Sequence, residues 1–167
     1  MTFGRESFAA LIPHRGRMCL LERVLAYDDD GILCAASSHR AADHPLAAAG
    51  RLDSAVGLEY AAQAAAIHGG LLAQRDGAVA RPGFLAGARD LRLFRERLDD
   101  LPGELVIRAE RLLASSDSLL YGFRLDCGAL PVCTGRLSVF FVPCDCRRDG
   151  GGGSIPGSAP TPRCGGG

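Results

Sequence analysis

One stretch of this chain decides its fold, and it reads Ser54-Ala-Val-Gly-Leu-Glu-Tyr-Ala-Ala-Gln-Ala-Ala-Ala-Ile67. Its polar side chains are few: Ser54, Glu59, Tyr60 and Gln63. A helix that is apolar on every face is a buried helix, so we expect this segment to lie in the core. The pattern continues to about Arg75, and Asp53 or Ser54 is the expected helix cap.

The carboxylate in the middle of this helix needs an explanation. Burying an unpaired charge is very costly, so Glu59 must be paired, protonated or part of a functional site. The side chains three and four residues away are not cationic, since they belong to Ala55, Val56, Ala62 and Gln63. The partner must therefore come from elsewhere in the fold. The candidate is His44, fifteen residues earlier, in a shared proton-transfer site.

Composition limits the class of protein. A chain of 167 residues with 47% apolar side chains fits one domain with a well-filled core. The 19 cationic and 19 acidic residues cancel, which argues against a protein that neutralises nucleic-acid phosphates. We see no signal peptide and no membrane span. The odd count of seven cysteines favours reduced thiols, so we expect a cytoplasmic protein.

The segments around the helix alternate between apolar and polar residues, which predicts strands. The expected strands are Met18–Tyr27, Ile32–Ser38, Phe84–Phe94, Glu104–Leu113, Leu119–Asp126 and Leu130–Val142. The fold class is therefore α+β, with a curved antiparallel sheet of about six strands wrapped around one long central helix. We expect the pair Gly69-Gly70 to fray this helix. A dimer that joins two sheets edge to edge would remove the exposed sheet edges.

The composition changes near the C-terminus. After Pro143 the chain is rich in Gly and Pro and has almost no bulky apolar residues. Such a segment buries too little surface to offset its ordering entropy. The sequence predicts one domain over residues 1–143 and a disordered tail over residues 144–167. Cys144 and Cys146 lack the partner pair of a zinc site, so we expect no metal there.

Four segments resemble the 3-hydroxyacyl-acyl-carrier-protein dehydratases, which have the hotdog fold. They are the opening Leu11-Ile-Pro-His-Arg15, the pair His44-Pro45, the helix Gly57-Leu-Glu-Tyr-Ala-Ala-Gln63, and the strand Phe84-Leu-Ala-Gly-Ala-Arg-Asp90. The dehydratase-like proteins of aryl polyene gene clusters are the most similar subgroup, because they share this helix and the following His68-Gly69-Gly70.

The chain departs from the dehydratase pattern at several places, which include Ser54, near the usual Gly before the helix, and a His44-to-Glu59 spacing about one residue longer. Standard dehydratases have His-Phe-Pro-Gly, whereas His44 is followed directly by Pro45. Tyr60 stands beside Glu59 where a small Ala is usual. We therefore expect the loop after His44 to follow a different path.

The resemblance implies dehydration of a 3-hydroxyacyl thioester on acyl carrier protein, in fatty acid or polyene and polyketide biosynthesis. It implies His44 as the base and Glu59, from the other subunit of a homodimer or heterodimer, as the acid. Neutral imidazole suits a base near neutral pH, and burial favours the protonated form of a carboxyl group. The amides of Ala55, Val56 and Gly57 are expected to hold the substrate carbonyl, and Gln63 to orient Glu59 or a water. No metal or cofactor is implied beyond the phosphopantetheine arm of the substrate.

Several alternatives remain open at this stage. A hotdog thioesterase would use Glu59 to activate water, and a non-catalytic subunit of a heterodimeric dehydratase would lack activity alone. His44 could be a turn residue, and Glu59 could form an ion pair with Arg89 or Arg92. We expect His14 to anchor its loop through backbone hydrogen bonds and His68 to be a core or interface residue. Three arginines lie either on a solvated strand end or on a surface for an acidic carrier protein: Arg92, Arg95 and Arg97.

Overall fold

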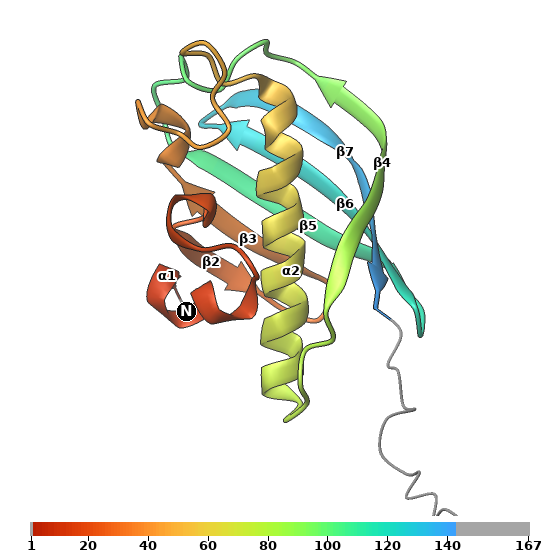
Figure 1. The fold of residues 1–167 in the computed structure, drawn as a ribbon. Coiled ribbons are helices and arrows are strands. Elements are labelled where there is room, and N and C mark those ends of the chain that lie inside the picture. The colour runs from red at the N-terminus through yellow and green to blue at the C-terminus, as the bar shows by residue number, and fades with distance from the viewer. Residues whose placement is uncertain (1, 143–167) are drawn as a thin grey trace, which may run out of the picture.

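The long helix α2 (Gly57–Arg75) lies across the concave face of a curved seven-stranded antiparallel sheet (Figure 1). The computed structural model describes residues 2–142. The strand order is β1-β2-β3-β5-β6-β7-β4. The strands are β1 (Phe3–Gly4), β2 (Arg23–Tyr27), β3 (Gly31–Ala36), β4 (Gly83–Leu93), β5 (Leu105–Ala114), β6 (Ser118–Cys127) and β7 (Leu130–Phe141). The predicted α+β class and hotdog fold are confirmed.

Short helical segments complete the chain. They are α1 (Arg5–Phe8) and the 3-10 turns Ala9–Leu11, Gly16–Met18, Ser38–Arg40 and Ser54–Val56. The expected strand from Met18 is shorter than predicted, because β2 begins only at Arg23. The physical reason is that the backbone groups of Met18 and Leu20 bond the side chain of Gln63 on α2 instead of a strand. The short strand β1, which pairs with β2, brings the sheet to seven strands.

The core lies between α2 and the inward side chains of the sheet. Residues of β5 alternate as the pleat requires, so that Leu105, Ile107 and Ala109 are buried while Arg108 and Glu110 are exposed. The helix is not buried on every face as predicted. One stripe of small residues on α2 stays partly or fully exposed: Ala62, Ala66, Gly69 and Ala73.

The two central glycines of α2 do not interrupt it. The helix is continuous to Arg75, so the expected fraying at Gly69-Gly70 is wrong. At Gly70 the absence of a side chain lets the N-terminal segment pack closely, since a Cβ there would lie 2.9 Å from the Cβ of Leu11. This contact brings the N-terminal loop against the helix.

Four cysteines of the described residues lie in the core. Cys19, Cys34, Cys127 and Cys133 are free and buried, as expected for small apolar side chains. The predicted tail over 144–167, with Cys144 and Cys146, lies outside the described residues. No helix within residues 2–142 is both long and apolar enough to cross a membrane.

Strand β4 lies at one end of the sheet and is bonded to β7 alone within the described residues. Large apolar side chains along it and just after it are exposed: Phe84, Leu85, Leu91, Leu93 and Phe94. An unpaired edge strand with exposed apolar side chains is a surface that pairs with another chain.

We predict opposite effects for the same substitution at two glycines of α2. A Cβ at Gly57 would lie 2.6 Å from the Cys133 sulfur and 3.1 Å from Leu125 Cδ2, so Gly57→Ala should lower the free energy of unfolding by about 1–3 kcal/mol. At Gly69 no atom lies within 4 Å, so Gly69→Ala should raise it by about 1 kcal/mol through helix propensity. Urea unfolding of both variants measures the two effects, and equal signs would contradict the packing described here.

Candidate functional site

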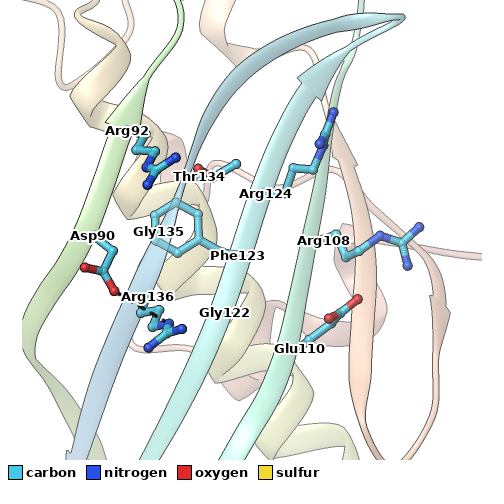
Figure 2. Close-up of a pocket in the computed structure, with 10 residues that line it drawn as sticks. All are labelled: Asp90, Arg92, Arg108, Glu110, Gly122, Phe123, Arg124, Thr134, Gly135 and Arg136. Atoms are coloured by element: carbon cyan, nitrogen blue, oxygen red, sulfur yellow. Dashed lines mark ion pairs between the residues drawn. The ribbon is translucent and has the colours of Figure 1, made fainter.

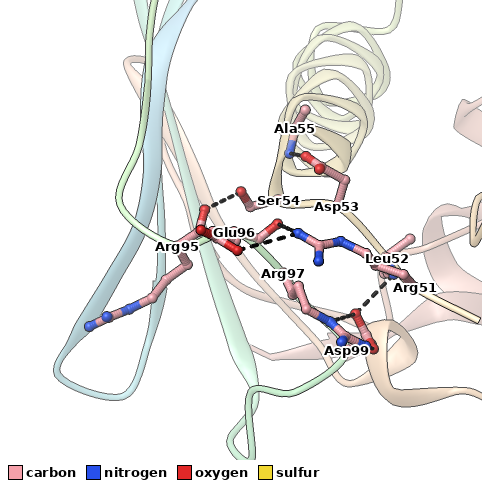
Figure 3. Close-up of polar contacts among 9 residues, drawn as sticks. All are labelled: Arg51, Leu52, Asp53, Ser54, Ala55, Arg95, Glu96, Arg97 and Asp99. Carbon is pink, nitrogen blue, oxygen red and sulfur yellow. Dashed lines mark hydrogen bonds and ion pairs between the residues drawn. The ribbon is translucent and has the colours of Figure 1, made fainter.

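The start of α2 is fixed by polar contacts to the segment between β4 and β5 (Figure 3). The Asp53 side chain accepts the Ala55 amide at 2.9 Å, which is an N-terminal cap. The Ser54 amide donates to the Glu96 carbonyl at 3.1 Å, and the Ser54 hydroxyl donates to the Arg95 carbonyl. The helix therefore begins at a defined point on the sheet.

A second set of contacts holds the chain just before this cap (Figure 3). The Leu52 amide donates to Asp99 Oδ1 at 2.9 Å, and Arg97 pairs with the same carboxylate. The hydrogen bonds from Arg97 and Leu52 lower the pKa of Asp99, so this carboxylate stays charged. Arg97 is thus occupied by a structural ion pair.

The amides at the helix start have partners within the chain. Ala55 donates to Asp53 Oδ1, Val56 to the Asp53 carbonyl at 3.1 Å, and Gly57 to the Ser54 carbonyl. The expectation that these three amides are free therefore does not hold for the chain as it stands. Their role as donors to a substrate carbonyl stays a prediction.

Glu59 projects from the first turn of α2 and contacts His14 of the N-terminal loop. Its Oε1 lies 3.0 Å from His14 Nε2 and 3.0 Å from Gln63 Nε2. The side chains of Glu59 and His14 are each 28% exposed. The other carboxylate oxygen, Oε2, has no partner among residues 2–142, so one oxygen is held while the other is free. Within this chain the partner of Glu59 is His14, and not the predicted His44 or the alternatives Arg89 and Arg92.

Gln63 is buried and its side-chain amide can adopt only one orientation. Its Oε1 accepts the Leu20 amide at 2.9 Å, and its Nε2 donates to the Met18 carbonyl at 2.8 Å. A backbone N–H can only donate and a carbonyl can only accept, so the two amide ends cannot be exchanged. The remaining N–H of Gln63 is aimed at Glu59, as the sequence predicts for an orienting residue.

His44 is buried and both of its ring nitrogens are engaged. Nδ1 accepts the backbone amide of Leu46 at 3.1 Å, so the proton of the neutral ring lies on Nε2. Nε2 lies 3.2 Å from the Tyr60 hydroxyl. The pKa of His44 is lowered, chiefly because burial disfavours the charged imidazolium.

The hydrogen bonds beyond His44 have a fixed direction. The Ser38 hydroxyl donates to the Leu20 carbonyl at 2.7 Å, so its oxygen must accept the Tyr60 proton at 2.7 Å. Tyr60 then accepts from His44 Nε2. Burial raises the pKa of Tyr60 to about 12, so the phenol keeps its proton. Neutral His44 in this arrangement has no free lone pair to receive a proton.

Leu20 joins the two histidine clusters through its backbone N–H and C=O groups. Its amide bonds Gln63, which holds Glu59, and its carbonyl accepts from Ser38, which leads through Tyr60 to His44. His14 and His44 therefore belong to one hydrogen-bonded network within a single chain. They do not meet, because Glu59 pairs with His14 while His44 bonds the neighbouring Tyr60.

Sequence reasoning missed the partners in this network. His14 was expected to anchor its loop, and Ser38 was not singled out. The signal for His14 was its place in the Leu-Ile-Pro-His-Arg opening. The expectation for His68 is confirmed for the core, since it is buried between the Tyr121 hydroxyl and the Asp28 carbonyl, each 2.8 Å away.

An apolar groove of about 730 Å³ runs along the exposed stripe of α2. Its walls include Pro13 and Arg15 of the N-terminal loop, Ala66 and Gly69 of the helix, and Phe141 of β7. Pro13 and Arg15 flank His14 in the chain. Ala66 is seven residues after Glu59, so both lie on one face of the helix. The groove therefore lies on the helix face that carries Glu59, although neither Glu59 nor His14 is among its lining residues.

A second pocket, of about 610 Å³, lies on the outer face of the sheet (Figure 2). Arginines from four neighbouring strands line it: Arg92, Arg108, Arg124 and Arg136. Arg136 pairs with Asp90 at 3.7 Å and Arg124 with Asp126 at 2.7 Å, so part of the positive charge is balanced. Of the three arginines proposed from the sequence for an acidic partner, only Arg92 lies in this pocket. The sheet separates this pocket from Glu59.

Comparisons with known proteins identify the family. The ApeP-like family (ApeP dehydratase) matches residues 6–148, most of the chain. The chain belongs to the ApeP-like dehydratases. No curated protein sequence matches it. As a member of a dehydratase family it is a hydro-lyase, an enzyme class that removes water from its substrate.

Solved structures confirm the hotdog fold of this ApeP-like chain. It is similar to a chain of the ApeI:P dehydratase heterocomplex from Xenorhabdus doucetiae, with a TM-score of 0.72 and 22% identity over 82% of this chain and 91% of that one. A thioesterase from Haemophilus influenzae gives a TM-score of 0.57 and 16% identity over 89% and 97%. A mutant thioesterase from Pseudomonas aeruginosa gives 0.53 and 17% over 74% and 81%. At these identities the likeness shows the fold alone.

We predict that stability falls on mild acidification. Burial lowers the pKa of His39, His44 and His68 from the ordinary value of 6.5. The unfolded chain then binds protons more readily than the folded one, so the free energy of unfolding should be constant from about pH 7 to 8 and fall as the pH drops below about 6.5. Denaturant unfolding at a series of pH values measures this. The lowered pKa values of Asp28 and Asp99 act only at lower pH, so a flat curve between pH 8 and 5 would contradict the neutral state of these histidines.

Proposed function

We propose that this ApeP-like chain dehydrates a 3-hydroxyacyl thioester carried on acyl carrier protein, giving the trans-2-enoyl thioester in fatty acid or polyene biosynthesis. The reaction needs a base for the proton next to the thioester carbonyl and an acid for the departing hydroxyl. The single observation that carries the proposal is the Glu59 carboxylate in a chain of a dehydratase family: its Oε1 accepts from Gln63 and lies 3.0 Å from His14 Nε2, while its Oε2 has no partner among residues 2–142.

Glu59 is the proposed proton donor to the leaving hydroxyl. Because Oε1 already accepts from Gln63 and lies against His14 Nε2, a proton on this carboxyl group is carried by Oε2. That oxygen is the one without a partner among residues 2–142. The acid proton therefore has a defined position, which is what efficient proton transfer requires.

His44 is the proposed base, following the dehydratase pattern, and its surroundings define what this role requires. Its lone pair on Nδ1 accepts the Leu46 amide, and Nε2 donates to Tyr60. To receive a proton, His44 must first release the Leu46 amide from Nδ1, because Nε2 already carries the ring proton. Substrate binding or subunit assembly would have to open the turn that contains Pro45 and Leu46.

The apolar groove is the proposed site of the acyl chain. It runs along small residues of α2, so an alkyl or aryl chain can lie against the helix without steric conflict. Burial of apolar substrate surface there contributes about 25 cal/mol per Å² to binding. The phosphopantetheine arm would bring the thioester toward Glu59.

A second candidate function has a specific observation in its favour. His44 is locked in the chain by Leu46 and Tyr60, and a structurally similar chain occurs in a dehydratase heterocomplex. The chain would then be the non-catalytic subunit of a heterodimeric dehydratase. In that case it dehydrates no substrate alone.

The partner subunit would join at the exposed edge of β4. Pairing two such edges, in a homodimer or with another hotdog chain, would cover the exposed apolar side chains of β4 and satisfy its free backbone groups. The two sheets would then form one continuous sheet.

We predict that Glu59→Gln lowers the dehydration rate at least 100-fold, because the amide cannot donate a carboxylic proton. The purified full chain is incubated with 3-hydroxyacyl carrier proteins of several chain lengths, and the products are read by intact mass. Loss of one water molecule supports the dehydratase, and loss of the whole acyl group indicates a thioesterase. His44→Ala tests the base in the same assay. Full turnover by both variants would end the assignment, and no change with wild-type protein would favour the non-catalytic subunit.

We also predict that Leu91→Asp weakens self-association or binding to a second hotdog chain. Leu91 on β4 is 39% exposed, and a carboxylate there would be buried without a partner in a joined sheet. Light scattering after size exclusion measures the mass of the assembly. Leu113→Asp on β5 is the matched control, since Leu113 is 61% exposed and away from this edge. An equal effect of both substitutions would argue against the β4 interface.

A further inference from the structure

We infer that His14 is a positioning residue for Glu59, a role that rests on the proposed function of this carboxyl group. His14 Nε2 lies 3.0 Å from Glu59 Oε1, and Gln63 donates to the same oxygen at 3.0 Å. These two contacts come from different elements and hold the carboxyl group against rotation. Oε2 is thereby directed away from both neighbours and is the oxygen offered to a substrate.

The tautomer of His14 follows from its second nitrogen. Nδ1 is buried and has no hydrogen-bond partner among residues 2–142. A buried N–H without an acceptor is more costly than an unused lone pair on a neutral ring, so the proton lies on Nε2. Nε2 is the nitrogen that faces Glu59. The ring is therefore set to donate to the carboxylate.

His14 does not serve to anchor its own loop. Neither ring nitrogen bonds a backbone group of the described residues 2–142. The loop is held by Arg15, whose guanidinium donates to the carbonyls of Ala9 at 3.2 Å, Ile12 at 2.7 Å and His14 at 3.2 Å. The close approach of Leu11 to Gly70 fixes the same loop on the helix. The contact with Glu59 is thus the specific polar contact of the His14 ring, and the loop keeps its other anchors without it.

Gln63 and His14 control different parts of the site. Gln63 is itself held by Met18 and Leu20, so its orientation does not depend on His14. Removing His14 should leave Glu59 with one donor and let the carboxyl group rotate. The effect should therefore be on the rate of the chemical step, with little effect on substrate binding.

The kinetic test uses the full chain with a 3-hydroxyacyl carrier protein that it dehydrates. His14→Ala should lower kcat roughly 10- to 100-fold while KM stays within about 3-fold. His14→Gln places an amide N–H near the position of Nε2 and should restore most of the rate. His68→Gln is the matched control, since His68 is a buried histidine nine residues beyond Glu59 on the opposite face of α2 and should leave kcat unchanged.

The outcomes separate this inference from the proposed function. Unchanged kcat in His14→Ala, a change confined to KM, or no recovery in His14→Gln would overturn the positioning role while leaving the dehydratase intact. A second measurement does not depend on activity or on the folding of the alanine variant. Two-bond ¹H–¹⁵N spectra of the wild-type chain should show His14 as the Nε2–H tautomer, and Glu59→Gln should shift its ring signals. The Nδ1–H tautomer, or signals that Glu59→Gln leaves unmoved, would refute the pairing even if wild-type protein proves inactive.

Discussion

The backbone of Leu20 is the point through which the whole site is connected. Its amide fixes the orientation of Gln63, and Gln63 in turn holds Glu59. Its carbonyl accepts from the Ser38 hydroxyl, which in turn accepts from the Tyr60 hydroxyl. An N–H can only donate and a carbonyl can only accept, so the direction of each of these hydrogen bonds is fixed. Buried polar networks gain specificity from satisfied partners, and His14 Nδ1 is a buried atom that has no partner among residues 2–142.

This network depends on close packing between the N-terminal loop and the central helix. Gly57 lets the helix start approach β6 and β7, and Gly70 lets Leu11 lie against the helix. A methyl group at either position would meet atoms closer than 3.0 Å, and the helix would have to move by a fraction of an ångström. Hydrogen bonds of about 3 Å tolerate little displacement. The small residues of α2 are thus as necessary to the site as the polar ones.

Much of the fold could be predicted from the sequence, because alternation marks the strands and the apolar run marks the helix. Glu59 and Gln63 were also correctly paired from their spacing of one turn. The partner His14 could not be found this way, since it lies 45 residues before Glu59 and meets it only through tertiary packing. The exposed stripe around Ala66 was missed for a related reason: apolar content does not reveal whether a helix face is covered by the same chain or left for a ligand or partner.

The state of His44 follows from two of the positions where this chain departs from the dehydratase pattern that it resembles. Because Pro45 comes directly after His44, the next residue, Leu46, turns its amide back onto Nδ1. Because Tyr60 replaces a small residue beside Glu59, a hydroxyl group reaches Nε2. Both differences give a His44 ring nitrogen a hydrogen-bond partner, and neither adds a hydrogen bond to Glu59 among residues 2–142. In this chain Glu59 Oε2 has no partner among residues 2–142, while both ring nitrogens of His44 are engaged. A dehydratase built on this chain must either open the His44 turn during turnover or take its base from another subunit.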